Sequence, residues 1–182
     1  ISGLILPTLG NILVDDVLID SQNLKNWQQN IAIVPQTIFL NDATVLENIA
    51  IGVDIDVINY EKVIKVAKLA QIDSFIESLP NKYKEKVGER GVRLSGGQRQ
   101  RIGIARALYK KTDVIIFDEA TSALDDKTEL EVINSIFNLN PNITILIIAH
   151  RLTTLKKCSQ VIELKDGRVL RTGSYKEIVG KT

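Results

Sequence analysis

The sequence predicts an α/β fold built on a mainly parallel β-sheet with helices covering each side. Three runs, at residues 31–34, 113–117 and 143–149, are apolar along their length, which is typical of strands buried on both faces. Two longer segments, 60–70 and 126–138, repeat apolar residues at helical spacing. Strands that alternate with helices favour a parallel sheet. With 182 residues and a hydrophobic fraction of 45%, the chain can bury the core of about one domain.

Turn and capping residues set the limits of the elements in the first half. Gly10-Asn11 leads into a short strand at 12–14, and Pro35 ends the strand at 31–34. The helices predicted next are one opened by the capping box of Thr44 and Glu47, one at 60–70, and a further turn or two at 72–79 that Pro80-Asn81 ends.

The second half returns to alternating strands and helices. Its predicted elements are the strand at 113–117, the helix at 126–138, the strand at 143–149, a hairpin of 161–164 and 168–170 around Asp166-Gly167, and a short helix at 174–179. The chain is therefore predicted to be one partial domain, residues 1–182. Within it, about 1–40 and 111–182 form the sheet-containing core, and about 41–110 form an inserted helical subdomain.

Charge and composition exclude several classes of protein. The net charge is +1, and only 5% of residues are aromatic, so binding of single-stranded nucleic acid by base stacking is not expected. The basic residues concentrate in 82–111. Such a cluster is either a solvated surface or a surface that attracts a polyanion. Cys158 is the single cysteine and fits a reducing compartment. A chain that starts at Ile1 and contains no methionine is expected to be a fragment.

Leu94-Ser95-Gly96-Gly97-Gln98 is the most informative stretch. Ser95 and Gln98 form a capping box at the start of a helical run that extends to Tyr109. The start of a helix presents unpaired N–H groups and partial positive charge, and two glycines leave them accessible. This combination predicts a phosphate-binding site, although an ordinary capped helix has the same pattern.

Several polar residues follow predicted strands at their carboxyl ends, where ligands bind in open α/β sheets. Asp118 suits a magnesium ion and Glu119 suits a base for an attacking water, although both could simply cap the next turn. Gln36 and His150 follow two other strands, and each alone would be a turn residue or a structural histidine. Ser122-Ala123-Leu124-Asp125 comes next and could be the N-cap of a helix.

Taken in order, these motifs resemble the ATP-binding-cassette (ABC) ATPase domain over nearly the whole chain. The resemblance implies a P-loop NTPase-like (RecA-like) fold and the cofactors ATP and Mg²⁺. It implies that Gln36 contacts magnesium, Asp118 binds magnesium, Glu119 is the catalytic glutamate and His150 is the switch histidine. It also assigns nucleotide contacts to the signature sequence and the D-loop, namely Leu94, Ser95, Gly96, Gly97, Gln98, Ser122 and Asp125.

The resemblance further implies an exporter. Residues 44–49 and 87–91 are similar to segments that face the transmembrane coupling helices of ABC exporters. The expected partners are a second ABC ATPase domain, identical or different and packed head to tail, and a transmembrane domain upstream in the same chain. No nucleic-acid partner is expected. The expected location is the cytoplasmic face of the cell membrane.

One family element is missing from the sequence. The phosphate loop G-x-x-x-x-G-K-[ST] and the N-terminal strands around it do not occur, and residues 2–10 resemble the segment that follows that loop. We therefore expect the 182-residue polypeptide by itself to bind ATP poorly and to hydrolyse none. A nucleotide titration checks this expectation, and tight binding would contradict it.

Two other functions remain open at this stage. One is a soluble ABC-type ATPase of DNA repair or translation, against which the exporter-like segments argue. The other is an interaction module that does not hydrolyse ATP, against which the intact Leu94–Gln98, Glu119 and His150 argue. The transported substrate and the choice between a homodimer and a heterodimer are not encoded in these residues.

Overall fold

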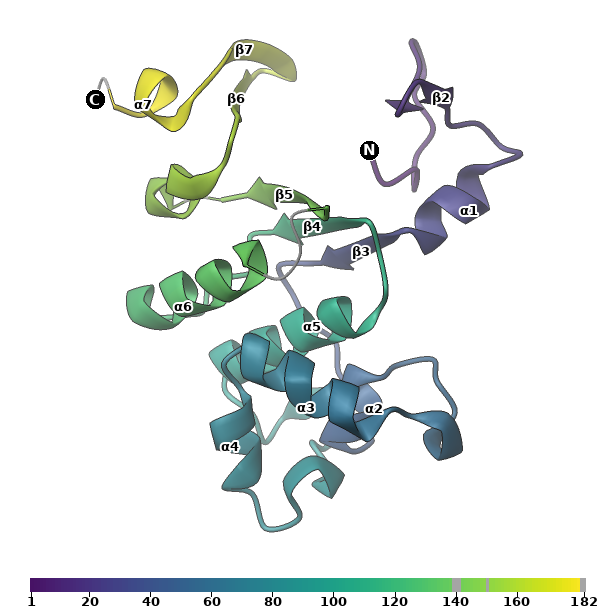
Figure 1. Ribbon diagram of the computed structural model, residues 1–182, viewed down its shortest axis with the longest axis vertical. Coiled ribbons are helices and arrows are strands. Elements are labelled where there is room, and N and C mark those ends of the chain that lie inside the picture. Colours follow the sequence, from purple (N-terminus) through teal and green to yellow (C-terminus); the bar gives the residue numbers. More distant parts are fainter. Residues whose placement is uncertain (139–141, 150, 181–182) are drawn as a thin grey trace.

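A three-stranded parallel sheet lies at the centre of the fold (Figure 1). The computed structural model describes residues 1–138, 142–149 and 151–180. The central strands are β3 (Ile31–Val34), β4 (Val114–Asp118) and β5 (Thr144–Ile148), in that spatial order. In the register of the sheet, Ile31 lies beside Val114, and Val114 lies beside Thr144. All three strands therefore end at the same edge, and the prediction of a parallel sheet is confirmed.

One face of this sheet forms part of the hydrophobic core. Alternate residues of a strand point to the same face, so Val34, Phe117 and Ile147 share a face and meet the buried side chains of the helices. The opposite face carries Ile33 and Ile148, whose exposed fractions are 40% and 54%. The same face also carries the buried Ile31 and Val114. The prediction that both faces are covered is therefore confirmed only in part, because the described residues bury one face more completely than the other.

The helical part lies below the sheet in Figure 1, and α5 (Gly96–Tyr109) lies between it and the strands. Thr44 caps α2 with both hydrogen bonds of a capping box, and Asn59 caps α3 through its side chain, so local sequence determines where these helices begin. The other elements of this part are α2 (Val45–Ile49), α3 (Tyr60–Leu69), α4 (Asp73–Glu77) and the 3₁₀ turns η1 (Ile55–Val57), η2 (Lys82–Lys84) and η3 (Glu89–Gly91).

The helix α6 and two hairpins complete the fold. Asp166 and Gly167 both have positive φ, as the predicted two-residue hairpin turn requires. The predicted strand at 12–14 is also confirmed, but its partner β2 and the helix α1 were not predicted. The bounds are β1 (Leu13–Val14), β2 (Val17–Leu18), α1 (Leu24–Gln29), α6 (Asp126–Phe137), the 3₁₀ segment η4 (Leu152–Lys157), β6 (Val161–Lys165), β7 (Arg168–Gly173) and α7 (Tyr175–Ile178).

Arginines of α5 connect the helical part to the loops around it. Arg106 donates from Nε to the carbonyl oxygen of Asn48 at 2.8 Å and from a terminal nitrogen to that of Phe39 at 3.0 Å. Burial lowers the pKa of the Arg106 guanidinium from its ordinary value.

None of the helices in the described ranges combines the length and apolar character needed to cross a bilayer.

Candidate functional site

Two predicted site residues meet at the carboxyl edge of the sheet. Gln36 follows β3 and Glu119 follows β4, and Nε2 of Gln36 donates a hydrogen bond to Oε2 of Glu119 at 2.7 Å. They are separated by 83 positions in the chain, so the parallel sheet is what brings them together. Asp118, the last residue of β4, is exposed at the same edge. The structure thus places an amide and two carboxylates where a ligand would bind.

The backbone of Glu119 is held in an unusual conformation. Its φ is +50°, which lies in the left-handed region that costs a residue with a side chain free energy. Its N–H group donates to the carbonyl oxygen of Ile148 at 3.0 Å, and its own carbonyl accepts from the N–H of Ser122 at 3.1 Å. The sharp turn therefore directs the Glu119 side chain from a fixed position at the end of β4.

The predicted capping box at the start of α5 is confirmed. The Ser95 hydroxyl accepts from the Gln98 N–H at 3.2 Å, and Oε1 of Gln98 accepts from the Ser95 N–H at 2.8 Å. Ser95 is exposed, while Leu94 is 7% exposed and anchors the approach to the helix in the core. The signature sequence therefore presents a helix start at the surface, as phosphate binding requires.

One of the two glycines of the signature sequence, Gly97, is also required by packing inside the chain. A Cβ at Gly97 would lie 3.0 Å from the carbonyl oxygen of Ala123, and one at Gly96 would lie 3.5 Å from the Ala123 Cβ. The D-loop therefore lies directly against the first turn of α5. The sequence indicated that both glycines leave space for a ligand. Close approach of the D-loop is a second reason for Gly97 alone, because the 3.5 Å contact at Gly96 is an ordinary van der Waals distance.

Two arginines fix the position of this helix start. Arg99 donates to the carbonyl oxygen of Leu94 at 2.6 Å. Arg101 donates to the carbonyl oxygens of Gly97 at 3.3 Å and Gln71 at 2.7 Å, which joins the first turn of α5 to the turn between α3 and α4. Burial lowers the pKa of the Arg101 guanidinium, because desolvation disfavours its charged form.

The D-loop is the segment Ser122–Asp125, and it ends as the N-cap of α6. Asp125 accepts hydrogen bonds from the N–H of Thr128 at 3.0 Å and from its hydroxyl at 2.7 Å. Both bonds favour the ionised carboxylate and lower the pKa of Asp125. The structural alternative for Asp125, a helix cap, is thus correct, and this cap fixes one end of the D-loop.

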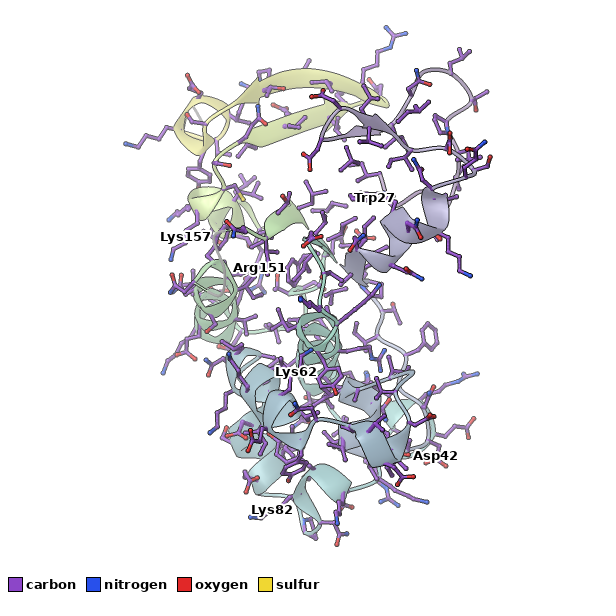
Figure 2. The ribbon with its side chains drawn as sticks, turned by 45° about the vertical axis from the view of Figure 1, so that its right-hand side comes forward. Trp27, Asp42, Lys62, Lys82, Arg151 and Lys157 are labelled. Atoms are coloured by element: carbon purple, nitrogen blue, oxygen red, sulfur yellow. The ribbon has the colours of Figure 1, made fainter. Side chains whose placement is uncertain are left out.

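A buried carboxylate lies beneath this loop. Glu129 is 4% exposed, and its Oε1 accepts from the hydroxyls of Thr121 at 2.8 Å and Thr154 at 2.6 Å. Its Oε2 accepts from Arg151 at 2.9 Å. Figure 2 shows Arg151 at the junction of α6 with the segment that follows β5. A cavity of about 250 Å³, lined by Glu119, Thr121, Ser122, Glu129, Ala149, Arg151 and Thr154, adjoins this cluster.

The predicted switch histidine, His150, lies outside the described residues, so its role stays a prediction. The residue after it, Arg151, is tied to Glu129 and also to Asp126 at 2.8 Å. Arg151, and with it the start of η4, is thus anchored to α6.

The residues at the sheet edge fit a magnesium ion that arrives with a nucleotide. Magnesium is held by one or two carboxylates together with water and phosphate oxygens, not by a cage of protein ligands. Asp118 supplies an exposed carboxylate beside Glu119, and the Gln36 amide oxygen is a further hard ligand. Within the described ranges no three His, Cys, Asp or Glu side chains gather around one point.

Sequence reasoning missed the buried polar residues that support the site. Gln100 lies 22 and 23 positions from its two partners in the D-loop. Glu129 lies 22 positions from Arg151 and 25 from Thr154, so no local pattern marks these pairs. The one usable signal was polarity at helical positions facing inward. Gln100 lies one turn before the buried positions Gly103 and Ile104 of α5. Glu129 lies one turn before the apolar positions Val132 and Ile133 of α6.

Comparisons with known proteins agree with this geometry. Residues 1–122 match the family model described as "ABC transporter". The chain is 41% identical over 170 residues to an ATP-dependent lipid A-core flippase of Methylobacillus flagellatus, covering 93% of the chain and 29% of that protein. It is 40% identical to the heterocyst differentiation ATP-binding protein HepA of a Nostoc species, covering 95% of the chain and 28% of that protein.

A solved structure shows the same similarity in three dimensions. A bacterial Atm1-family ABC exporter with ATP bound superimposes with a TM-score of 0.89 at 37% sequence identity, over 96% of this chain and 30% of that one. The predicted P-loop NTPase-like fold class is thereby confirmed. The chain spans less than a third of the length of these relatives. Because the family model matches well over half of its residues, the chain belongs to the ABC transporter family.

Proposed function

We propose that this chain is part of the nucleotide-binding domain of an ABC exporter, which binds and hydrolyses ATP to drive transport across a membrane. The observation that carries the proposal is the hydrogen bond between Gln36 and Glu119 beside Asp118, at the edge where three parallel strands end. A carboxylate held by an amide, next to a second exposed carboxylate, suits a base beside a metal-bound phosphate.

Each residue has a separate task in this mechanism. Asp118 binds Mg²⁺, which supplies charge stabilisation to the transferred phosphoryl group. Glu119 accepts the proton of the attacking water, and Gln36 orients its carboxylate through the 2.7 Å hydrogen bond. His150 contacts the γ-phosphate. Phosphoryl transfer depends chiefly on positioning and charge stabilisation, and these residues provide both.

The signature helix completes the site of a second domain. Ser95 and the N–H groups of the first turn of α5 face outward, and they bind the nucleotide held by a partner domain in a head-to-tail dimer. Each of two equivalent sites then contains residues from both domains. Dimer closure on ATP and opening after hydrolysis move the transmembrane domains.

The exporter assignment rests on two segments and on the relatives. The segments at 44–49 and 87–91, both typical of exporters, lie side by side. The N–H of Val87 donates to the carbonyl of Ala43 at 3.1 Å, and that of Val45 donates to Glu85 at 3.0 Å. Relatives named as a flippase and an exporter share this region. The domain therefore lies on the cytoplasmic side of a membrane, with its transmembrane partner across this paired surface.

Removal of the Ser95 hydroxyl tests the proposal. In the intact protein reconstituted in lipid vesicles, Ser95→Ala is expected to lower Mg²⁺-dependent ATP hydrolysis about tenfold, because one phosphate contact is lost. Steady-state release of phosphate measures the effect.

Ser174→Ala is the matched control, since Ser174 and Glu177 form the same capping box at α7. That variant is expected to stay within about twofold of the wild type because it loses only a helix cap. Equal losses of ATP hydrolysis in the two variants would mean that Ser95 acts only as a helix cap, and would contradict its assignment as a phosphate contact. An intact protein with no ATP hydrolysis would contradict the function itself.

A further inference from the structure

Gln100 connects α5 to the D-loop, two parts of the site that lie apart in the sequence. It is 5% exposed, although it is a polar residue at the start of the second turn of α5. Its Nε2 donates to the hydroxyl of Ser122 at 3.2 Å, and its Oε1 accepts from the N–H of Ala123 at 2.9 Å. The amide of one buried side chain therefore pairs with two consecutive residues of the D-loop.

The surrounding contacts leave the D-loop little freedom relative to α5. The carbonyl oxygen of Ala123 lies close enough to Gly97 that a Cβ there would approach it to 3.0 Å. Leu124 is 4% exposed and Thr121 is 8% exposed, so both flanking residues are packed. A shift of the first turn of α5 would therefore be passed to Ala123 through one side chain and one backbone contact.

Hydrogen-bonded turns connect the D-loop to Glu119, three residues before its start. The Ser122 N–H donates to the carbonyl of Glu119 at 3.1 Å, and the Leu124 N–H donates to the carbonyl of Thr121 at 3.0 Å. These two bonds make residues 119–124 a continuous series of turns. Displacement of Ala123 thus changes the orientation of Glu119, whose left-handed backbone already depends on its surroundings.

We propose that Gln100 is a positioning residue that couples the signature helix to the orientation of Glu119 in the same chain. This inference rests on the proposed ATPase function, in which the signature helix contacts the nucleotide of the partner domain while Glu119 acts on the nucleotide of its own domain. Gln100 then connects the two half-sites of one chain. It touches neither nucleotide, and it acts through the D-loop alone.

The coupling is tested in the intact transporter with two substitutions at one position. Gln100→Leu keeps the size and removes both hydrogen bonds. Ser122 and Ala123 are exposed, so water can take over their bonds, and this variant is expected to fold. Gln100→Glu keeps an oxygen to accept from Ala123, and the Ser122 hydroxyl can reverse to donate to the second oxygen.

The expected results separate positioning from folding and from binding. Gln100→Leu should lower kcat about tenfold and leave the dissociation constant for ATP within about twofold, because the loss falls on geometry at the reacting centre. Gln100→Glu should keep at least about half of the wild-type kcat. Hydrogen exchange in nucleotide-free protein should show faster exchange of the Ala123 amide in Gln100→Leu alone.

The control for the leucine substitution is Gln29→Leu, the same change on the exposed face of α1. It should change neither kcat nor exchange in the D-loop. A Gln100→Leu variant with wild-type kcat, or equal loss in both Gln100 variants, would overturn the inference. Failure of the proposed function is recognised separately, since the wild type would then hydrolyse no ATP and Glu119→Gln would have no effect.

Discussion

Glu119→Gln in the intact protein is expected to lower ATP hydrolysis by at least about 100-fold, because an amide cannot accept the proton of the attacking water. The site geometry should survive the change. Nε2 of Gln36 donates to Oε2 of Glu119 at 2.7 Å, and the oxygen of the substituted amide can accept the same hydrogen bond. The dissociation constant for ATP is therefore expected to stay within about threefold of the wild type.

Single-turnover hydrolysis and equilibrium nucleotide binding in the same preparation measure the two effects. Glu131→Gln, the same change on the exposed surface of α6, is the matched control and should leave both unchanged. Near-normal turnover in Glu119→Gln would rule out Glu119 as the base. A parallel loss of ATP binding would instead mean that Glu119 stabilises the structure of the site at this edge of the sheet.

Local patterns predicted most elements of the fold correctly. The predicted capping boxes at Thr44 and Ser95 each fix the start of a helix within a few residues, because their hydrogen bonds span three positions. The parallel sheet also followed from local signals, since its strands are apolar throughout. The meeting of Gln36 and Glu119 then followed from topology, because parallel strands end at one edge.

The rest depended on contacts that no local pattern encodes. The strand β2 has two residues and α1 has six, which is too short for a periodic signal. The unequal burial of the two sheet faces depends on which helices pack against them, and Ile33 does not differ in type from Ile115, which is buried on the other face. Gln100 resembles its polar neighbours in the sequence, and only the fold shows that it faces the D-loop.

Glu129 shows most clearly what the sequence left hidden. It lies on the first turn of α6, where an acidic residue would be expected to stabilise the helix at the surface. The structure buries it instead and pairs it with two hydroxyls and Arg151. Both hydroxyls belong to buried threonines, Thr121 and Thr154, so they cannot turn to bulk water if the carboxylate is removed.

Glu129→Ala is therefore expected to destabilise the folded domain by about 3 kcal/mol, since it leaves buried donors without an acceptor. For a domain of this size such a loss lowers Tm by about 6–12 °C, which a thermal unfolding scan of the intact protein measures.

Asp126→Asn is the control, because Asp126 also pairs with Arg151 but its side chain is 91% exposed. An exposed ion pair contributes less than about 1 kcal/mol, so this variant should shift Tm little. Equal shifts in the two variants would mean that the ion pair with Arg151, and not the buried threonine hydroxyls, accounts for the stabilisation by Glu129.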